Sequence, residues 1–554
     1  RRYPASSQTP TRLVHIDWPN KKIRVLESVG SNPQYVTLSY RWGVSRSAYK
    51  LTAETKVKLT SESGESMDRL PKTIQDACFA CYRLGYRHLW VDRLCIMQDC
   101  KEDWARESSK MSQVYRNSVC TISASCAADE DRGLFTDRSH FNFQPFHIRI
   151  KTSQTESQES LVIMPDNQHE GHPSGMLGYL ANRGWVFQER LLSKRTVYFG
   201  KEQVFWECSE LQANESWPCG QSRPLGELYE LELGTPYHQH YVPPRMAFGS
   251  AAAWKISTMC SSICGIQRLL LHLLHWRGQG HGAKNYRSTS ARVARNGDPW
   301  PRIVADYTER IFTFEDDKLP GLSGLATDFN NNHRNSQDKY YAGLWKSTII
   351  QDLCWQVVRQ GSKYSRTRQT KLPSKYRAPS WSWASVDSKI QYERGVQRKA
   401  VFLVDYKDIC LSYASNDRHG AICDGWIQLS GFLKPVIVSL YDDKRKALLY
   451  GPKREKLDLF YNAYADFDVE DPADETQVFC LPMIQPDNDN EVYFQFLLPR
   501  GTSKHPQPTQ KLLGLAKEGP QEIQRVGLGS GLIKDETAFA KWLSQSPKQD
   551  IVIR

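Results

Sequence analysis

The first part of the chain alternates between two hydrophobic patterns. In "YVTLSYRWG" (residues 35–43) every second residue is aliphatic or aromatic, which is the period of a β-strand. "HLWVDRLCI" (88–96) and "VCTISAS" (119–125) are almost continuously apolar, as in strands covered on both faces. Between them, residues 70–85 and 101–116 carry an apolar stripe at helical spacing. This order of strands and helices predicts a parallel sheet with right-handed crossovers.

The pattern changes further along the chain. Residues 183–208 predict a helix and two strands, residues 302–358 are mainly helical, and strands dominate after about residue 385. The fold class is therefore α/β: an N-terminal domain with a mainly parallel sheet flanked by helices, a helical middle region and a β-rich C-terminal region. The predicted domains are residues 1–215, residues 216–395 with a mobile insertion, and residues 396–554.

Composition narrows the class of protein. A chain of 554 residues, 40% apolar and 24% charged, is typical of a globular protein with two or three domains. The net charge of +12 lies largely in loop-like runs such as residues 363–377, without the basic stripe of a nucleic-acid-binding module, so we expect no nucleic-acid partner. Residues 251–276 are the most membrane-like, but Lys255 and Arg268 interrupt them, and no membrane span is expected.

Cysteine usage indicates a reducing compartment. The 14 cysteines lie mostly in apolar runs, so we expect free thiols and a cytoplasmic location. Cys78 and Cys81 form one C-x-x-C pair with no second pair at zinc spacing, and His272 and His275 have no acidic third ligand nearby. We expect no metal site and interpret these residues as core or loop positions.

Polar side chains gather where the first two predicted strands end. Ligands of parallel sheets bind beyond the carboxyl ends of the strands, so these residues predict a substrate-binding crevice. Arg41 would bind an anionic group and Tyr40 or Trp42 would stack on a flat ring. Alternatively, the two aromatic residues fill the core and Arg41 pairs with Asp92. The candidate binding residues are Ser39, Tyr40, Arg41, Trp42, Asp92, Cys95 and Gln98.

Two glutamates are further candidates. On a helix that begins near Lys101, Glu107 flanks the stripe that contains Trp104 and should lie close to the sheet. A carboxylate there is either paired with a cation or held for chemistry, and both interpretations stay open. Glu189, in "FQER", is the second carboxylate candidate, with a salt bridge at a helix end as its alternative.

Long motifs resemble the fungal heterokaryon-incompatibility domain over about residues 35–208. Arg93 and Met97 stand where that family usually has a small residue and an aliphatic one. The resemblance implies intracellular non-self recognition, a form of innate immunity, ending in programmed cell death, with a partner incompatibility or receptor protein. Its motifs are residues 35–43, 70–125 and 183–199, and residues 307–326, 340–345 and 378–385 resemble segments that commonly follow the domain.

The same domain is similar to Toll/interleukin receptor (TIR) domains, in "LSYRWG" and in "DWARES". Several TIR domains cleave NAD with a glutamate that follows a tryptophan on this helix. The resemblance assigns that catalytic role to Glu107, three residues after Trp104 where four is more usual.

The implied chemistry needs few groups. Positive charge develops on the ribose and nicotinamide leaves as a neutral ring, so a carboxylate, an arginine and an aromatic wall suffice. NAD would then be a substrate, with no bound cofactor, and homo-oligomerisation would complete the site. The alternative is a non-enzymatic module that signals by assembly.

Overall fold

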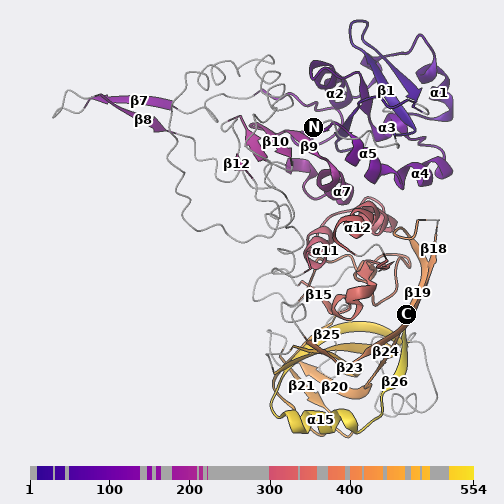
Figure 1. Ribbon diagram of the computed structural model, residues 1–554, viewed down its shortest axis with the longest axis vertical. Coiled ribbons are helices and arrows are strands. Elements are labelled where there is room, and N and C mark those ends of the chain that lie inside the picture. The colour runs from indigo at the N-terminus through magenta and orange to yellow at the C-terminus, as the bar shows by residue number, and fades with distance from the viewer. Residues whose placement is uncertain are drawn as a thin grey trace. The chain divides into compact units, whose positions relative to one another are not determined.

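The chain folds into two compact units, residues 1–289 and residues 290–554 (Figure 1). The structure is a computed structural model. The residues that it describes are 9–28, 31–43, 49–137, 146–151, 158–163, 177–208, 211–215, 221–222, 298–334, 337–358, 372–392, 400–414, 417–440, 446–467, 476–486, 490–499 and 523–554.

A ten-stranded sheet forms the centre of the first unit, in the order β12-β11-β10-β9-β6-β3-β5-β1-β2-β4. Its four central strands, β9, β6, β3 and β5, are parallel, and antiparallel strands extend both edges. The prediction that residues 35–42, 88–96 and 119–124 share one parallel sheet is confirmed. The strands are β1 (Arg12–Asp17), β2 (Lys22–Glu27), β3 (Val36–Ser39), β4 (Glu65–Ser66), β5 (His88–Trp90), β6 (Cys120–Ser123), β9 (Arg195–Phe199), β10 (Val204–Cys208), β11 (Leu211–Asn214) and β12 (Gln221–Ser222).

Helices connect these strands and cover the sheet. α2 packs on β3 and β5 through an apolar stripe that includes Cys78 and Cys81, both fully buried, so their role in the core is confirmed. Tyr115 of α5 packs edge-on against Trp90 of β5. The helices are α1 (Ala53–Thr60), α2 (Lys72–Arg83), α3 (Asp92–Cys95), α4 (Lys101–Ser108), α5 (Met111–Asn117) and α7 (Gly184–Leu192), with 3-10 turns η1 (Met67–Arg69) and η3 (Gly178–Leu180). A separate hairpin pairs β7 (Phe146–Lys151) with β8 (Gln158–Ile163).

Two local predictions in this unit are wrong. The strand predicted over residues 88–96 ends at Trp90, because Asp92 begins a helical turn and its carboxylate accepts a hydrogen bond from the Arg93 amide. Residues 101–116 form two helices, α4 and α5, and Trp104 is 41% exposed instead of buried. α4 buries Asp103 and Glu107, because Arg12 on β1 supplies a cation for Asp103.

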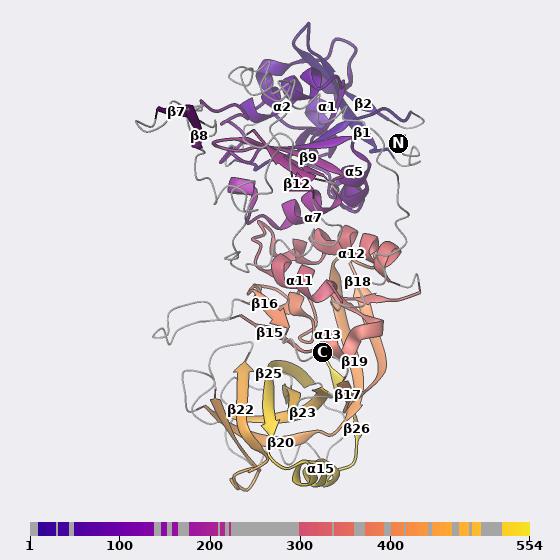
Figure 2. The same cartoon turned by 60° about the vertical axis from the view of Figure 1, so that its left-hand side comes forward.

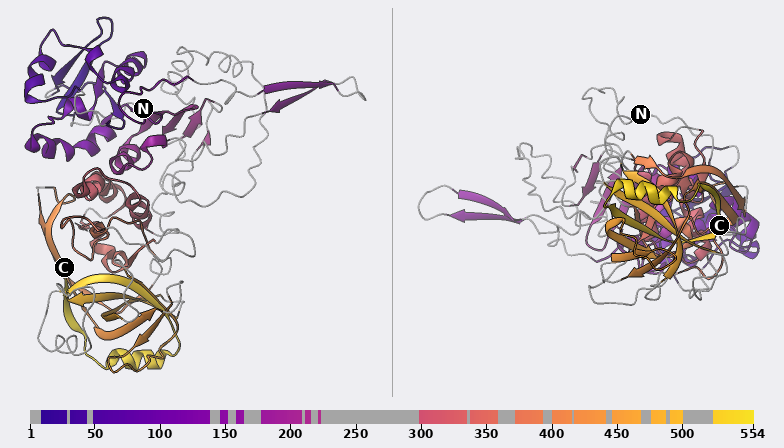
Figure 3. Two further views of the ribbon diagram at one scale, coloured as in Figure 1. Left: turned by 180° about the vertical axis from the view of Figure 1, so that it is seen from behind. Right: turned by 90° about the horizontal axis from the view of Figure 1, so that it is seen from below.

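The C-terminal strands of the second unit close into a barrel, as the β-rich prediction requires (Figures 2 and 3). β23 pairs with β20, and the ring continues through β21, β22, β25 and β24 back to β23. β17, β26, β19 and β18 extend the sheet beyond the ring. The strands are β17 (Ala400–Phe402), β18 (Asp405–Tyr413), β19 (Ile422–Gly431), β20 (Lys434–Leu440), β21 (Lys446–Tyr450), β22 (Phe460–Phe467), β23 (Thr476–Pro486), β24 (Glu491–Pro499), β25 (Ile523–Ile533) and β26 (Gln549–Ile553).

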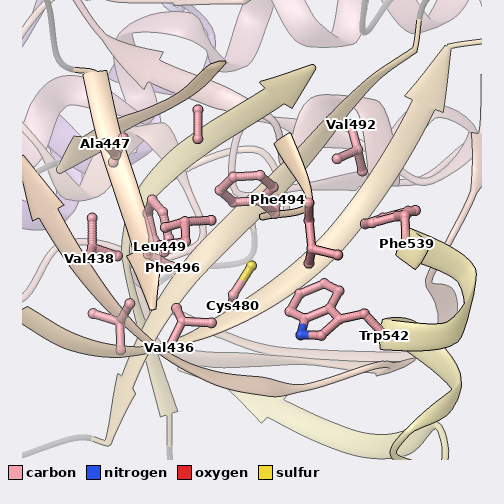
Figure 4. Close-up of a cluster of buried hydrophobic side chains, with 14 of the residues drawn as sticks. Val436, Val438, Ala447, Leu449, Cys480, Val492, Phe494, Phe496, Phe539 and Trp542 are labelled. Atoms are coloured by element: carbon pink, nitrogen blue, oxygen red, sulfur yellow. The ribbon is translucent and has the colours of Figure 1, made fainter. Parts of the chain in front are cut away.

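The barrel encloses a hydrophobic core (Figure 4). Phe494 and Phe496 of β24 lie in it, and α15 (Glu536–Ser544) contributes Phe539 and Trp542 from one end of the barrel (Figure 2). Gly529 faces Phe494 so closely that a Cβ atom there would lie 2.3 Å from the ring, which explains a glycine inside a strand.

Residues 298–392 combine helices with short strand pairs. Their core is rich in fully buried tryptophans, including Trp381 and Trp383 of the "PSWSWAS" segment. This segment forms a turn followed by a 3-10 helix, η6 (Trp383–Ser385). The other elements are α11 (Trp300–Thr308), η4 (Glu315–Lys318), α12 (Pro320–His333), β13 (Tyr340–Tyr341), β14 (Leu344–Trp345), η5 (Lys346–Thr348), α13 (Ile349–Asp352), β15 (Trp355–Val357) and β16 (Ile390–Tyr392).

Candidate functional site

The carboxyl ends of β3 and β5 meet through a hydrogen bond between two predicted site residues. Trp42, just after β3, donates its indole N–H to Oδ2 of Asp92 over 2.8 Å. The other carboxylate oxygen, Oδ1, accepts the Arg93 amide over 2.6 Å. Both contacts fix Asp92 at the start of α3, where its side chain is half-buried.

Arg93 organises the residues around this contact. Its guanidinium is buried, lies 4.3 Å from the centre of the Trp42 ring and donates through Nε to the Tyr40 hydroxyl over 3.3 Å. Nη2 forms an ion pair with Oε1 of the fully buried Glu130, also at 3.3 Å. Tyr40 and Trp42 therefore lie against a buried cation, which gives the Tyr40 hydroxyl a hydrogen-bond partner.

Glu189 of α7 approaches the same strand end and is buried. Burial raises the pKa of Glu189 to about 7; the nearby Asp92 charge also raises this pKa, while Ser39, Arg183 and Tyr115 lower it. Although Ser39 lies close enough to influence this pKa, neither its hydroxyl oxygen nor Oε2 of Glu189 has a partner with hydrogen-bonding geometry among the described residues. Two buried polar atoms at this strand end are thus unsatisfied, which native structures rarely tolerate.

Asp92 and Glu189 therefore form a pair of interacting carboxyl groups. Burial raises the pKa of Asp92 above its usual value, against the lowering effects of the Trp42 and Arg93 hydrogen bonds and of the Arg183 charge. Because the pKa of Glu189 is about 7, this carboxyl group can gain or lose a proton near neutral pH, and the charge of Asp92 influences that equilibrium. Such a site can accept hydrogen bonds, donate one, or transfer a proton.

Glu107 belongs to a different network, on α4. Its Oε1 accepts hydrogen bonds from the Thr11 hydroxyl (2.9 Å), Arg106 Nε (3.1 Å) and Lys110 Nζ (3.2 Å). The Glu107 side chain is buried, whereas those of Arg106 and Lys110 are 51% and 40% exposed. Within the described part of the chain, no hydrogen bond or ion pair joins Glu107 to Arg41 or to Asp92.

The remaining predicted residues fall into three situations. Arg41 is exposed and makes no hydrogen bond or ion pair with any described residue, so Trp42 and not Arg41 is the partner of Asp92. Cys95 is buried, and burial raises the pKa of its thiol to about 12. Gln98 donates to the carbonyls of Asp92 and Ile96 and so holds the turn.

Three residues of this site escaped the analysis of the sequence. Arg93 was visible only as an unusual residue after Asp92, and Tyr115 as a position on an apolar stripe. Glu130 follows a segment without periodicity, and nothing local indicates that it meets a cation 37 positions earlier. The available signal was an arginine inside an apolar run, next to Asp92. A buried arginine requires an acid as its partner, which must come from elsewhere in the chain.

Neither a metal site nor a membrane-spanning helix is found among the described residues. They contain no group of three or more histidine, cysteine, aspartate or glutamate side chains that could hold a metal ion. None of their helices is both long and apolar enough to cross a membrane. Residues 251–276, with His272 and His275, lie outside the described residues.

Comparison with known proteins found one similarity to a protein family. Residues 35–189 match the family described as heterokaryon incompatibility protein (HET), from the start of the strand-end motif to Glu189 in α7. No curated protein matched the chain, and no solved structure did.

Proposed function

We propose, from the premise that residues 35–189 form a heterokaryon incompatibility (HET) domain, that the protein is an intracellular effector of non-self recognition that triggers cell death by cleaving NAD once it oligomerises. The family match carries the first part of this proposal. The carboxylates around the parallel strands support the second part, because N-glycosidic cleavage needs a carboxylate beside the ribose.

The reaction is hydrolysis of the bond between C1′ of the ribose and the nicotinamide nitrogen. The bonding pair leaves with the nitrogen, so nicotinamide departs neutral and positive charge develops on the ribose. Water adds at C1′ and loses a proton, which gives ADP-ribose, nicotinamide and H⁺. A carboxylate near C1′ stabilises this transition state electrostatically.

Glu107 is the proposed catalytic carboxylate, and its surroundings suggest how the activity stays latent. In this structure Arg106 and Lys110 neutralise the Glu107 carboxylate. In the proposed active state a ribose that develops positive charge would take their place. Both cations are carried by largely exposed side chains, which a contact with a second copy can redirect. Oligomerisation would then free the carboxylate for substrate.

A second candidate function is a non-enzymatic assembly module. The same three hydrogen bonds to Glu107 favour it, because a carboxylate with this many partners has a sufficient structural role in anchoring α4. In that case cell death would follow from recruitment of another protein, without NAD loss.

The test is NAD consumption by the full chain fused to an inducible oligomerisation module. We expect nicotinamide and ADP-ribose to appear on induction, and Glu107→Gln, which keeps the shape but removes the charge, to reduce the rate about 10²-fold or more. Glu102→Gln is the matched control, because Glu102 is an exposed carboxylate on the same helix.

The outcomes separate the candidates. Cell death on induction without NAD loss would select the assembly module. NAD loss that is equal in the wild type and in Glu107→Gln would keep the enzymatic proposal but remove Glu107 from it. Circular dichroism of each variant checks that α4 and the sheet remain folded.

A further inference from the structure

The unsatisfied polar atoms at the end of β3 indicate a ligand. Ser39 Oγ and Glu189 Oε2 belong to side chains that are 4% and 8% exposed, and neither atom has a partner with hydrogen-bonding geometry among the described residues, although Ser39 lies close enough to Glu189 to lower its pKa. Leaving a buried polar group without a hydrogen bond destabilises the folded protein. A bound molecule with hydroxyl groups would remove this cost at both atoms.

We propose that Ser39, Asp92 and Glu189 form a subsite for the cis-diol of a nucleotide ribose. The inference rests on the proposed function for the choice of a nucleotide over another polyol. Each oxygen of Asp92 accepts one hydrogen bond, from Trp42 or Arg93, and keeps a lone pair for a ligand hydroxyl. Ser39 and Glu189 supply the second acceptor and the donors that neighbouring hydroxyls need.

The charges around the subsite agree with a phosphate beside the ribose. Arg183 is half-buried and lies near enough to lower the pKa of both carboxyl groups. Arg41 is exposed, follows Ser39 by two residues and has no partner among the described residues. Guanidinium groups bind phosphate oxygens in bidentate fashion, so either residue can hold the phosphate that a nucleotide brings.

The experiment measures binding to the full chain by calorimetry, with AMP and 2′-deoxy-AMP as the probes. Neither molecule contains a nicotinamide bond, so binding does not depend on cleavage. We expect AMP to bind about 10- to 100-fold more tightly than 2′-deoxy-AMP, because the deoxy compound leaves buried polar groups unpaired.

Ser39→Ala is the decisive variant. It removes an unpartnered buried hydroxyl, so we expect the fold to be at least as stable, while AMP binding weakens about 10-fold and 2′-deoxy-AMP binding changes little. Ser123→Ala is the matched control: Ser123 is the register partner of Ser39 on β6, but its hydroxyl is already within 3.1 Å of that of Ser125. Its affinity for AMP should equal that of the wild type.

The diol subsite can be disproved independently of the proposed function. Equal affinity for AMP and 2′-deoxy-AMP, or an unchanged affinity in Ser39→Ala, would overturn the diol subsite even if the oligomerised protein cleaves NAD. Discrimination between the two nucleotides that Ser39→Ala abolishes would establish the subsite even if no NAD is lost. Absence of AMP binding at millimolar concentration would also overturn it, with ordered water as the occupant of the unsatisfied atoms.

Discussion

Two groups of acids in the first unit have opposite surroundings. Asp103 and Glu107 of α4 are surrounded by cations: Arg12 pairs with Asp103 at 2.6 Å, and Arg106 and Lys110 contact Glu107. Asp92 and Glu189 at the strand ends have no ion pair among the described contacts, and one Glu189 oxygen has no partner.

The difference appears in the pKa values. Burial acts to raise the pKa of Asp103, but hydrogen bonds from Arg12 and the Met97 amide outweigh it and hold this pKa below its usual value. For Asp92 and Glu189 the effect of burial prevails. Compensated acids fasten a helix to a sheet, whereas uncompensated ones store free energy that a ligand can release.

The largest effect should come from breaking the compensated cluster. Arg12→Met leaves the buried Asp103 without its bidentate partner, and we expect the free energy of unfolding to fall by about 3–5 kcal/mol. Chemical denaturation of the full chain, followed by tryptophan fluorescence, measures it. Arg106→Ala, which removes an exposed partner of the same carboxylate, should cost no more than about 1 kcal/mol. Similar losses in both variants would contradict this assignment.

The uncompensated cluster should respond to pH with the opposite sign. Glu189 has an ordinary pKa of 4.5 when unfolded and about 7 when folded, so the folded state binds more protons between these values. Stability therefore falls as pH rises from about 4.5 through 7, by about 3 kcal/mol in total. Asp103 contributes the reverse: its stabilisation is present above its unfolded pKa and is lost on acidification.

Glu189→Gln isolates this contribution. We measure the free energy of unfolding of both proteins at a series of pH values. The stability of the variant relative to the wild type should increase as pH rises from about 4.5 to about 7, and the difference should be constant above about pH 8. A difference that does not change with pH would mean that Glu189 is ionised in the folded protein, and the contrast between the two clusters would disappear.

Sequence patterns predicted the architecture better than the pairing of its charges. Apolar runs placed 35–42, 88–96 and 119–124 in one parallel sheet because their periodicity is local. The face that α4 buries could not be read from the local sequence. It is determined by the ion pair between Asp103 and Arg12, which lies 91 positions earlier, and Trp104 is exposed as a result. Ser39, Trp42 and Asp92 were brought together at the strand ends as the topology required, whereas Glu130, 37 positions from Arg93, had no signal in its own segment.

A smaller effect should come from crowding the ion pair between Arg93 and Glu130 at the strand ends. A Cβ atom on Gly43 would lie 2.6 Å from the Glu130 carboxylate, which its ion pair with Arg93 prevents from moving freely. We expect Gly43→Ala to lower the free energy of unfolding by about 1–3 kcal/mol. In the Glu130→Asp variant the side chain is one methylene shorter, so Gly43→Ala should cost less there. If Gly43→Ala costs the same with Glu130 and with Asp at position 130, the contact is not present.

The smallest effect concerns the residue that the sequence placed in the core. Trp104 is 41% exposed, so Trp104→Ala should change the free energy of unfolding by no more than about 0.5 kcal/mol. Trp90→Ala is the control: this side chain is 2% exposed on β5, and its loss should cost about 3–5 kcal/mol. If both substitutions are costly, α4 is held by its tryptophan. If only Trp90→Ala is costly, the buried acids Asp103 and Glu107 hold α4 in place. The exposed Trp104 then provides an aromatic surface on the same helix that a partner can cover.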